Sequence, residues 1–159
     1  MSEPASLEEW MNAAVASAEE LATVALGFDG SNVVGPRDTL PKDLTSALIA
    51  LVSDTSSVQL GVASTKEGCQ QLARALLCME PDEDDLPEDD VSDAVGEVIN
   101  IVGGQVKRLI GGPDSTMKLG LPLIVHGRFE SADNLETSIL DLTVGPVPIT
   151  LFVLKSHNA

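Results

Sequence analysis

Apolar residues recur at helical spacing in three segments of the chain. Residues 6–27 combine good helix formers with Ser6, a favourable N-cap residue, and with acidic residues in the first turn. Residues 65–79 predict a second helix capped by Thr65. A third helix is expected over residues 93–110, with one apolar face made by Val91, Val95, Val98, Val102, Val106 and Leu109 and with Ile99 and Ile110 at its edge.

Runs rich in β-branched and other apolar residues predict the strands. Residues 44–54 and 57–64 flank the short polar stretch Asp-Thr-Ser-Ser and are typical of a hairpin. Three later strands are expected over residues 121–130, 135–145 and 146–155. Loops are expected over residues 28–43, 80–90 and 111–120. The first of these loops has room for one short strand.

Helices and strands are therefore partly segregated along the chain. This order favours an α+β fold with a mainly antiparallel sheet covered by long helices. A helix is followed by a hairpin in the first half and by strands in the second half, which indicates a weak internal helix-hairpin pseudo-repeat. Several strands alternate poorly between polar and apolar residues, so both faces of the sheet are expected to be covered. We expect residues 1–159 to form a single domain.

Composition narrows the classes of function. The chain has 25 Asp and Glu residues against 9 Lys and Arg, a net charge of −16. Such a charge disfavours binding to nucleic acid or to an anionic membrane, because both need a basic surface. Residues 1–10 lack the features of a signal peptide, and no apolar run approaches the roughly 18 residues of a membrane span. We expect a soluble cytoplasmic protein with a core of Val, Leu, Ile and Ala.

Two features favour a structural explanation over a metal site. Cys69 and Cys78 lie nine residues apart, and we expect two buried thiols in a reducing compartment, neither a disulfide nor metal ligands. Residues 80–90 are strongly acidic, which is typical of a solvated loop that also supplies the first-turn acids of the next helix. A metal or partner site in this loop remains the alternative.

The third helix carries a polar stripe opposite its apolar face: Asp93, Glu97, Asn100, Gly104 and Lys107. A glycine costs a helix interior about 1 kcal/mol relative to alanine. The pair Gly103 and Gly104 therefore indicates that something approaches the backbone closely. Either a partner approaches, or the helix packs tightly on its own sheet, and the second explanation suits Gly103 better than Gly104.

Glu97 and Asn100 are the candidate chemical groups of this stripe. A carboxylate can accept a proton or pair with a cation, and a carboxamide can position a water molecule. These two groups are better suited to completing a partner's site than to forming a whole active site. Ordinary surface solvation remains the alternative, since an exposed helix often carries Glu and Asn. The same spacing recurs at Glu9 and Asn12.

The segment "DAVGEVINIVGGQVK" resembles the central helix of the CheX/CheC/FliY group of chemotaxis phosphatases, and the CheX branch fits best. The matching features are Glu97-x-x-Asn100, the Gly-Gly pair that follows and the basic Lys107. The likeness extends over roughly residues 44–155, through the first hairpin, the acidic connector and the last strands.

The resemblance implies an enzyme that removes phosphate from the phospho-aspartate of a CheY-like response regulator. Asn100 would orient the attacking water and Glu97 would pair with a lysine of the regulator. Asp93, Gly104 and Lys107 would contact the partner. The phosphorylated regulator would supply Mg²⁺, so the protein would need no cofactor or metal of its own.

The resemblance also bears on the assembly, on a second site and on the alternatives to a phosphatase. It implies a homodimer formed through the sheet. Because CheC-like proteins carry two motifs, Glu9 and Asn12 are a possible second site, although no Gly-Gly pair follows them. The alternatives to a phosphatase are a non-catalytic module of the same fold that docks a receiver domain or another signalling protein, and a purely structural assembly domain.

Overall fold

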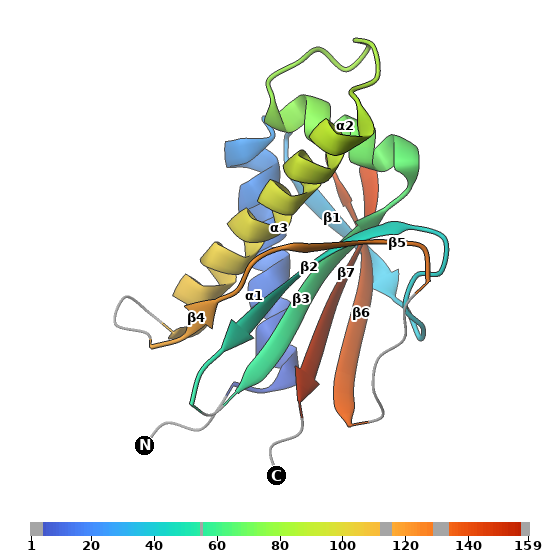
Figure 1. Cartoon of the computed structure of the whole chain (residues 1–159). Helices are drawn as coiled ribbons and strands as arrows, with labels where there is room; N and C mark the ends of the chain where they lie inside the picture. The colour runs from blue at the N-terminus through green and yellow to red at the C-terminus, as the bar shows by residue number, and fades with distance from the viewer. Residues whose placement is uncertain (1–4, 55, 112–115, 129–133, 157–159) are drawn as a thin grey trace.

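A seven-stranded antiparallel sheet forms the centre of the described molecule (Figure 1). The computed structural model describes residues 5–54, 56–111, 116–128 and 134–156. The strands are β1 (Ser31–Pro36), β2 (Thr45–Val52), β3 (Ser57–Ser64), β4 (Lys118–Leu119), β5 (Leu123–His126), β6 (Leu135–Val144) and β7 (Val147–Ser156). Their order is β1-β6-β7-β3-β2, and both β4 and β5 pair with β2.

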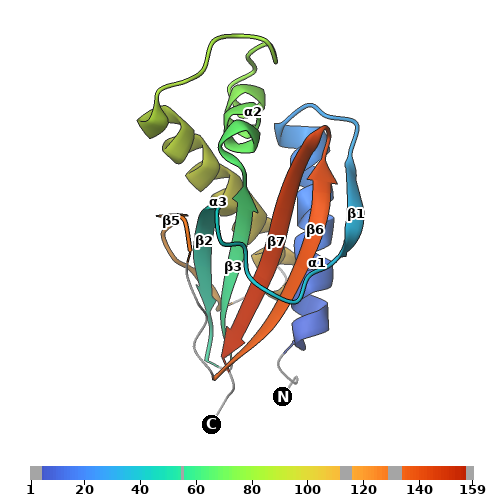
Figure 2. The same ribbon diagram turned by 90° about the vertical axis from the view of Figure 1, so that its right-hand side faces the viewer.

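The helices cover one face of this sheet. They are α1 (Leu7–Glu20), the π-helical turn η1 (Leu21–Ala25), α2 (Lys66–Leu76) and α3 (Glu88–Gly111). Helices α1 and α3 cross the sheet on the same side, and α2 lies over one end of it (Figures 1 and 2). Ser6 and Thr65 cap α1 and α2 as predicted, each accepting a hydrogen bond from a backbone N–H of the first turn.

Alternation along the strands builds a core on each face of the sheet. In β7, Leu151 and Val153 face the helices, whereas Phe152 and Leu154 face the opposite side. A second cluster there contains Leu48, Ala63 and Ile139, and Leu40 and Leu44 from the segment before β2 pack against it. In Figure 2 this segment crosses the sheet on the side away from the helices. The expectation that both faces are covered is therefore confirmed only in part, because Val52 and Gln59 on this second face stay exposed.

The predicted pseudo-repeat appears in the topology. One half contributes α1, β1 and the hairpin β2–β3, and the other contributes α3, β5 and the hairpin β6–β7. The two hairpins meet through β3 and β7 at the centre. Each outer strand then pairs with the other half, β1 with β6 and β5 with β2. Helices α1 and α3 therefore occupy equivalent places in the two halves.

Several predicted boundaries are wrong for local reasons. Helix α3 begins at Glu88 instead of residue 93, because the acidic residues before Val91 serve as its first turn. Helix α2 ends at Leu76, and Cys78 adopts a left-handed φ of 59° just beyond it. Leu109 is 51% exposed because the last turn of α3 reaches the margin of the molecule (Figure 1).

The later part of the chain also differs from the prediction. The expected loop 111–120 contains the two-residue strand β4. Strand β5 covers only Leu123–His126 of the strand predicted over 121–130, whose last two residues lie outside the described part of the chain. The short strand allowed within residues 28–43 is β1. The hairpin β2–β3 lies where it was predicted, and the strands predicted over residues 135–145 and 146–155 pair with each other as β6 and β7.

The acidic connector before α3 is fastened to α2. The side-chain amide of Gln70 donates to the carbonyl of Leu86 at 3.0 Å and accepts from the N–H of Leu86 at 2.9 Å. The buried guanidinium of Arg74 pairs with Asp85 at 3.1 Å and with Glu67 at 3.2 Å. These contacts hold the connector in place directly before the first turn of α3.

Candidate functional site

The polar stripe predicted on α3 forms one face of that helix in the structure. Glu97 and Asp93 are exposed, and Asn100, Gly104 and Lys107 are half-buried. The opposite face is buried from Val91 to Val106. Spacings of four, three, four and three residues keep the stripe on one side, and it extends about 21 Å along the helix axis. The sequence pattern thus placed all five residues correctly on one surface.

The two central glycines face different surroundings. A Cβ atom at Gly103 would lie 2.9 Å from Cγ2 of Ile49 and 2.9 Å from Cδ1 of Leu119, so this glycine lets α3 pack closely on β2 and β4. A Cβ atom at Gly104 would meet nothing within 4 Å. Close packing on the sheet therefore explains Gly103, whereas Gly104 leaves the exposed side of the helix open beside Asn100.

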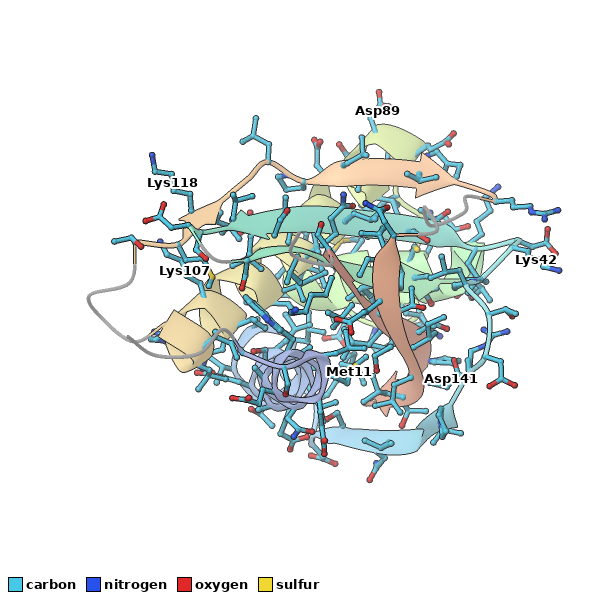
Figure 3. The ribbon with its side chains drawn as sticks, turned by 90° about the horizontal axis from the view of Figure 1, so that it is seen from below. Met11, Lys42, Asp89, Lys107, Lys118 and Asp141 are labelled. Atoms are coloured by element: carbon cyan, nitrogen blue, oxygen red, sulfur yellow. The ribbon has the colours of Figure 1, made fainter. Side chains whose placement is uncertain are left out.

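Strands β4 and β5 border the stripe on one side. A Cβ atom at Gly96 would lie 3.7 Å from Pro122, so the segment between the two strands lies against α3 at the residue before Glu97. Leu121 in that segment is 90% exposed. Lys107 of the stripe and Lys118 of β4 lie at the same end of the molecule (Figure 3). The stripe therefore ends in a locally basic area, although the whole chain is acidic.

A groove borders the stripe on the other side. It has a volume of about 400 Å³ and lies between α3 and the end of α1 with η1. Asn100 is half-buried because it forms part of the groove wall. The lining residues are Ser17, Glu20, Leu21, Val24, Ala25, Asn100, Ile101, Gly104, Gln105 and Arg108. Sequence reasoning missed this α1–α3 groove, because the apolar run of residues 21–26 reads as a continuation of the helix.

The chemistry that these side chains offer is limited to positioning and pairing. The exposed carboxylate of Glu97 can accept hydrogen bonds or pair with a cation. The carboxamide of Asn100, one turn further along, can hold a water molecule while its other atoms bond elsewhere. Within the described ranges, no group of three or more His, Cys, Asp or Glu side chains is arranged to hold a metal ion.

The possible second motif on α1 has a different local role. The N–H of Ser6 donates to the Glu9 carboxylate at 3.2 Å, and the N–H of Glu9 donates to the Ser6 hydroxyl at 3.1 Å. This reciprocal pair is a capping box at the start of the helix. Asn12 is exposed, and Trp10 between the two is fully buried. Glu9 thus stabilises the start of α1, and a second site formed by Glu9 and Asn12 stays a prediction.

The histidines and cysteines are not members of the stripe. Nδ1 of His126 lies 3.2 Å from the hydroxyl of Thr45 on the neighbouring strand β2. His157 lies outside the described residues. Both cysteines are free thiols. Cys69 is buried as predicted, but Cys78 is exposed beyond the end of α2, so the expectation of two buried thiols is wrong for Cys78.

None of the helices in the described part of the chain has the length and hydrophobicity needed to span a bilayer.

Known structures share this fold over nearly the whole chain. The chemotaxis protein CheX of Vibrio vulnificus has a TM-score of 0.76 and 19% identity, over 93% of this chain and 99% of that chain. A CheC-like superfamily protein from Shewanella sp. PV-4 has a TM-score of 0.75 and 18% identity, over 94% and 98%. CheX of Borrelia burgdorferi, solved in complex with CheY, BeF₃ and Mg²⁺, has a TM-score of 0.72 and 16% identity, over 98% and 100%.

The sequence comparisons point in the same direction. No curated protein sequence matched the chain. The family model described as chemotaxis phosphatase CheX matches residues 45–139, which is more than half of the chain and includes the whole polar stripe. The sequence match and the shared antiparallel fold show that this protein belongs to the CheX family of chemotaxis phosphatases.

Proposed function

We propose that this protein is a cytoplasmic chemotaxis phosphatase that hydrolyses the phospho-aspartate of a CheY-like response regulator. The observation that carries the proposal is the polar stripe of α3, in which Glu97 and Asn100 project beside an open Gly104 within the segment matched by the CheX family. The Borrelia burgdorferi relative was solved with CheY bound, which supports a receiver domain as the partner.

Each residue of the stripe has a distinct task in this mechanism. Asn100 enters the receiver's active site, and its carboxamide holds a water molecule in line with phosphorus. Glu97 pairs with a cationic side chain of the receiver and so sets the register of docking. The water oxygen bonds to phosphorus as the bond from phosphorus to the aspartate oxygen breaks, the aspartate leaves as a carboxylate, and both water protons depart with inorganic phosphate as H₂PO₄⁻. The gain in rate comes from orientation and electrostatics.

The surroundings of these two residues serve docking. Gly104 allows the receiver's backbone to approach α3, and Asp93 and Lys107 contact it at the two ends of the stripe. Mg²⁺ belongs to the phosphorylated receiver in this proposal, as in other phosphoryl-transfer sites that use the ion to neutralise charge on phosphate. Local contacts of Lys107 and Arg108 then matter more than long-range attraction, because the chain as a whole carries a net charge of −16.

The decisive experiment measures the loss of phosphate from a phosphorylated CheY-like receiver with wild-type protein and with Asn100→Ala. We expect wild-type protein to accelerate the loss and Asn100→Ala to reduce the acceleration by about 100-fold or more, as for a misplaced reactant. Asn12→Ala is the matched control, because it makes the same change at the same motif spacing on α1. Its acceleration should equal that of wild-type protein.

Other outcomes would reject parts of the proposal. Full acceleration by Asn100→Ala would exclude Asn100 as the residue that positions water. A large loss with Asn12→Ala instead would move the activity to α1. Tight binding of the receiver without faster loss of phosphate would favour the non-catalytic docking module.

We also propose that the protein is a homodimer formed through its sheet. Strand β1 lies at one end of the described sheet, and Val33 and Val34 on it are both more than half exposed. Exposed apolar residues on an outer strand are unusual unless another chain covers them. Sedimentation equilibrium measures the mass directly, and a monomer at micromolar concentration would contradict this assembly.

A further inference from the structure

The α1–α3 groove adjoins the two stripe residues that the proposed reaction uses most closely. Asn100 and Gly104 belong both to the stripe and to the groove wall. The groove continues along α3 as far as Arg108, about 12 Å beyond Asn100 along the helix axis. A standard interface covers about 800 Å² per partner, a patch roughly 28 Å across. A protein surface pressed against Asn100 therefore also covers the groove.

The wall formed by α1 and η1 is apolar and unusually exposed. Leu21 is buried at its base, and Ala25 is half-buried. Val24 on the same wall is 76% exposed. A partner docked on the stripe would cover this exposed valine and the concave apolar surface beside it. Ile101 of α3 lies on the opposite wall and is also only partly buried.

The π-helical turn is what shapes this wall. The N–H of Leu26 donates to the carbonyl of Leu21 at 3.0 Å, five residues back instead of four. The extra residue in the turn changes which side chains face the core: Leu21 and Ala22 are buried, whereas Thr23 and Val24 are exposed. Such turns are rare and occur frequently at functional sites.

The rim of the groove is polar. Glu20 at the end of α1 and Arg108 on α3 are both exposed, and Gln105 is half-buried between the two helices. A partner surface with an apolar side chain in its centre and polar groups around it would fit this groove. An apolar centre with a polar rim is the usual anatomy of a specific protein–protein contact.

We propose that the α1–α3 groove is a specificity pocket that receives an apolar side chain of the receiver domain, next to the receiver's phosphorylation site. This inference rests on the proposed function, since it assumes that the receiver docks on Asn100. Val24 is a specificity-determining residue that acts through binding alone. The polar rim of Glu20, Gln105 and Arg108 pairs with polar groups of the receiver around that side chain.

The test compares Val24→Ser with Val52→Ser. Val52 is a matched control because it is also an exposed valine, at 46%, and it lies on β2, outside both the α1–α3 groove and the outer strand β1. The binding probe is a CheY-like receiver domain carrying BeF₃⁻ and Mg²⁺, titrated by calorimetry. Burial of most of a valine side chain predicts about a tenfold increase in Kd for Val24→Ser and none for Val52→Ser. Val24→Ile keeps the apolar surface and should restore the wild-type Kd.

Steady-state dephosphorylation separates this inference from the proposed function. Val24→Ser should raise KM about tenfold and leave kcat unchanged, because no group near the phosphorus is altered. If Asn100→Ala abolishes activity while Val24→Ser has wild-type Kd and KM, the phosphatase assignment stands and the specificity pocket is rejected. If no receiver domain is bound or dephosphorylated by wild-type protein, both are rejected.

A second copy of this chain is the competing occupant of the groove. Sedimentation equilibrium distinguishes it from the receiver. A loss of dimer mass with Val24→Ser, together with an unchanged Kd for the receiver, would show that the groove binds another subunit and would overturn the proposal.

Discussion

Gly103 lies directly over Ile49. A Cβ atom on this glycine would stand 2.9 Å from Cγ2 of Ile49, a distance tighter than ordinary van der Waals contact. Helix α3 therefore approaches β2 closely enough to leave no room for even a methyl group. The adjacent Gly104 points away from the sheet, where a Cβ atom would meet nothing within 4 Å. Gly103 thus allows α3 to pack closely on the sheet, and Gly104 leaves the other side of the helix open.

Alanine at these two positions should change stability in opposite directions. Gly103→Ala overpacks the contact with Ile49 and should lower the free energy of unfolding by about 1–3 kcal/mol. Gly104→Ala removes backbone freedom without a clash and should raise it by about 0.5–1 kcal/mol. Urea unfolding of the two variants measures both values. Equal effects at the two positions would contradict the different surroundings described for them.

Loss of the Gln70 side chain should release the acidic connector from α2. Gln70→Ala leaves both backbone polar groups of the half-buried Leu86 without their partner, so we expect a loss of about 1–3 kcal/mol in the free energy of unfolding. Gln71→Ala is the control, since it removes the same side chain one position away. Hydrogen exchange at the first turn of α3 should become faster only in Gln70→Ala. An unchanged exchange rate would show that the hydrogen bonds of Gln70 do not hold the connector in place.

The carboxylate of Glu19 should make one contribution to stability depend on pH. Its hydrogen bonds from the hydroxyl and the N–H of Ser31 lower the pKa of Glu19 below its ordinary value of 4.5. As pH falls, the carboxylate of Glu19 becomes protonated at a higher pH in the unfolded chain than in the folded chain. The contribution is therefore complete above pH 4.5 and is lost as pH falls through the lower folded pKa.

Comparison with Glu19→Gln isolates this effect. The difference in urea midpoint between wild-type protein and Glu19→Gln should be constant from pH 7 to pH 5 and should shrink as pH falls below 4.5. Glu20→Gln changes the net charge equally at the adjacent position and controls for it. A difference that grows on acidification would contradict the sign of the pKa shift.

The two cysteines should react at very different rates. Burial raises the pKa of the Cys69 thiol to about 11, so at pH 8 only about one part in a thousand is thiolate. Cys78 is exposed. Alkylation with iodoacetamide at pH 8 should modify Cys78 quickly and Cys69 only after unfolding in urea. Mass spectrometry of Cys78→Ser should then show no fast modification, and rapid labelling of that variant would contradict the burial of Cys69.

Local patterns in the sequence determined much of the architecture. A short polar turn between two β-rich runs predicted the hairpin β2–β3, because a hairpin depends on contacts between neighbouring segments. Ser6 and Thr65 marked the starts of two helices for the same reason. The helical period placed Glu97, Asn100 and Gly104 on one face, since that relation is set by the backbone of α3 alone.

Other features required contacts between distant parts of the chain. The helical period favoured close packing for Gly103, but only the packed structure shows that Gly103 meets Ile49, which lies 54 residues earlier. The exposure of Leu109 depends on where α3 leaves the sheet, which its own periodicity cannot show. The α1–α3 groove arises because a π-helical turn meets the middle of α3. The sequence by itself determined which side chains α3 presents, and only the tertiary structure decided which surfaces surround them, because packing joins residues that no local pattern connects.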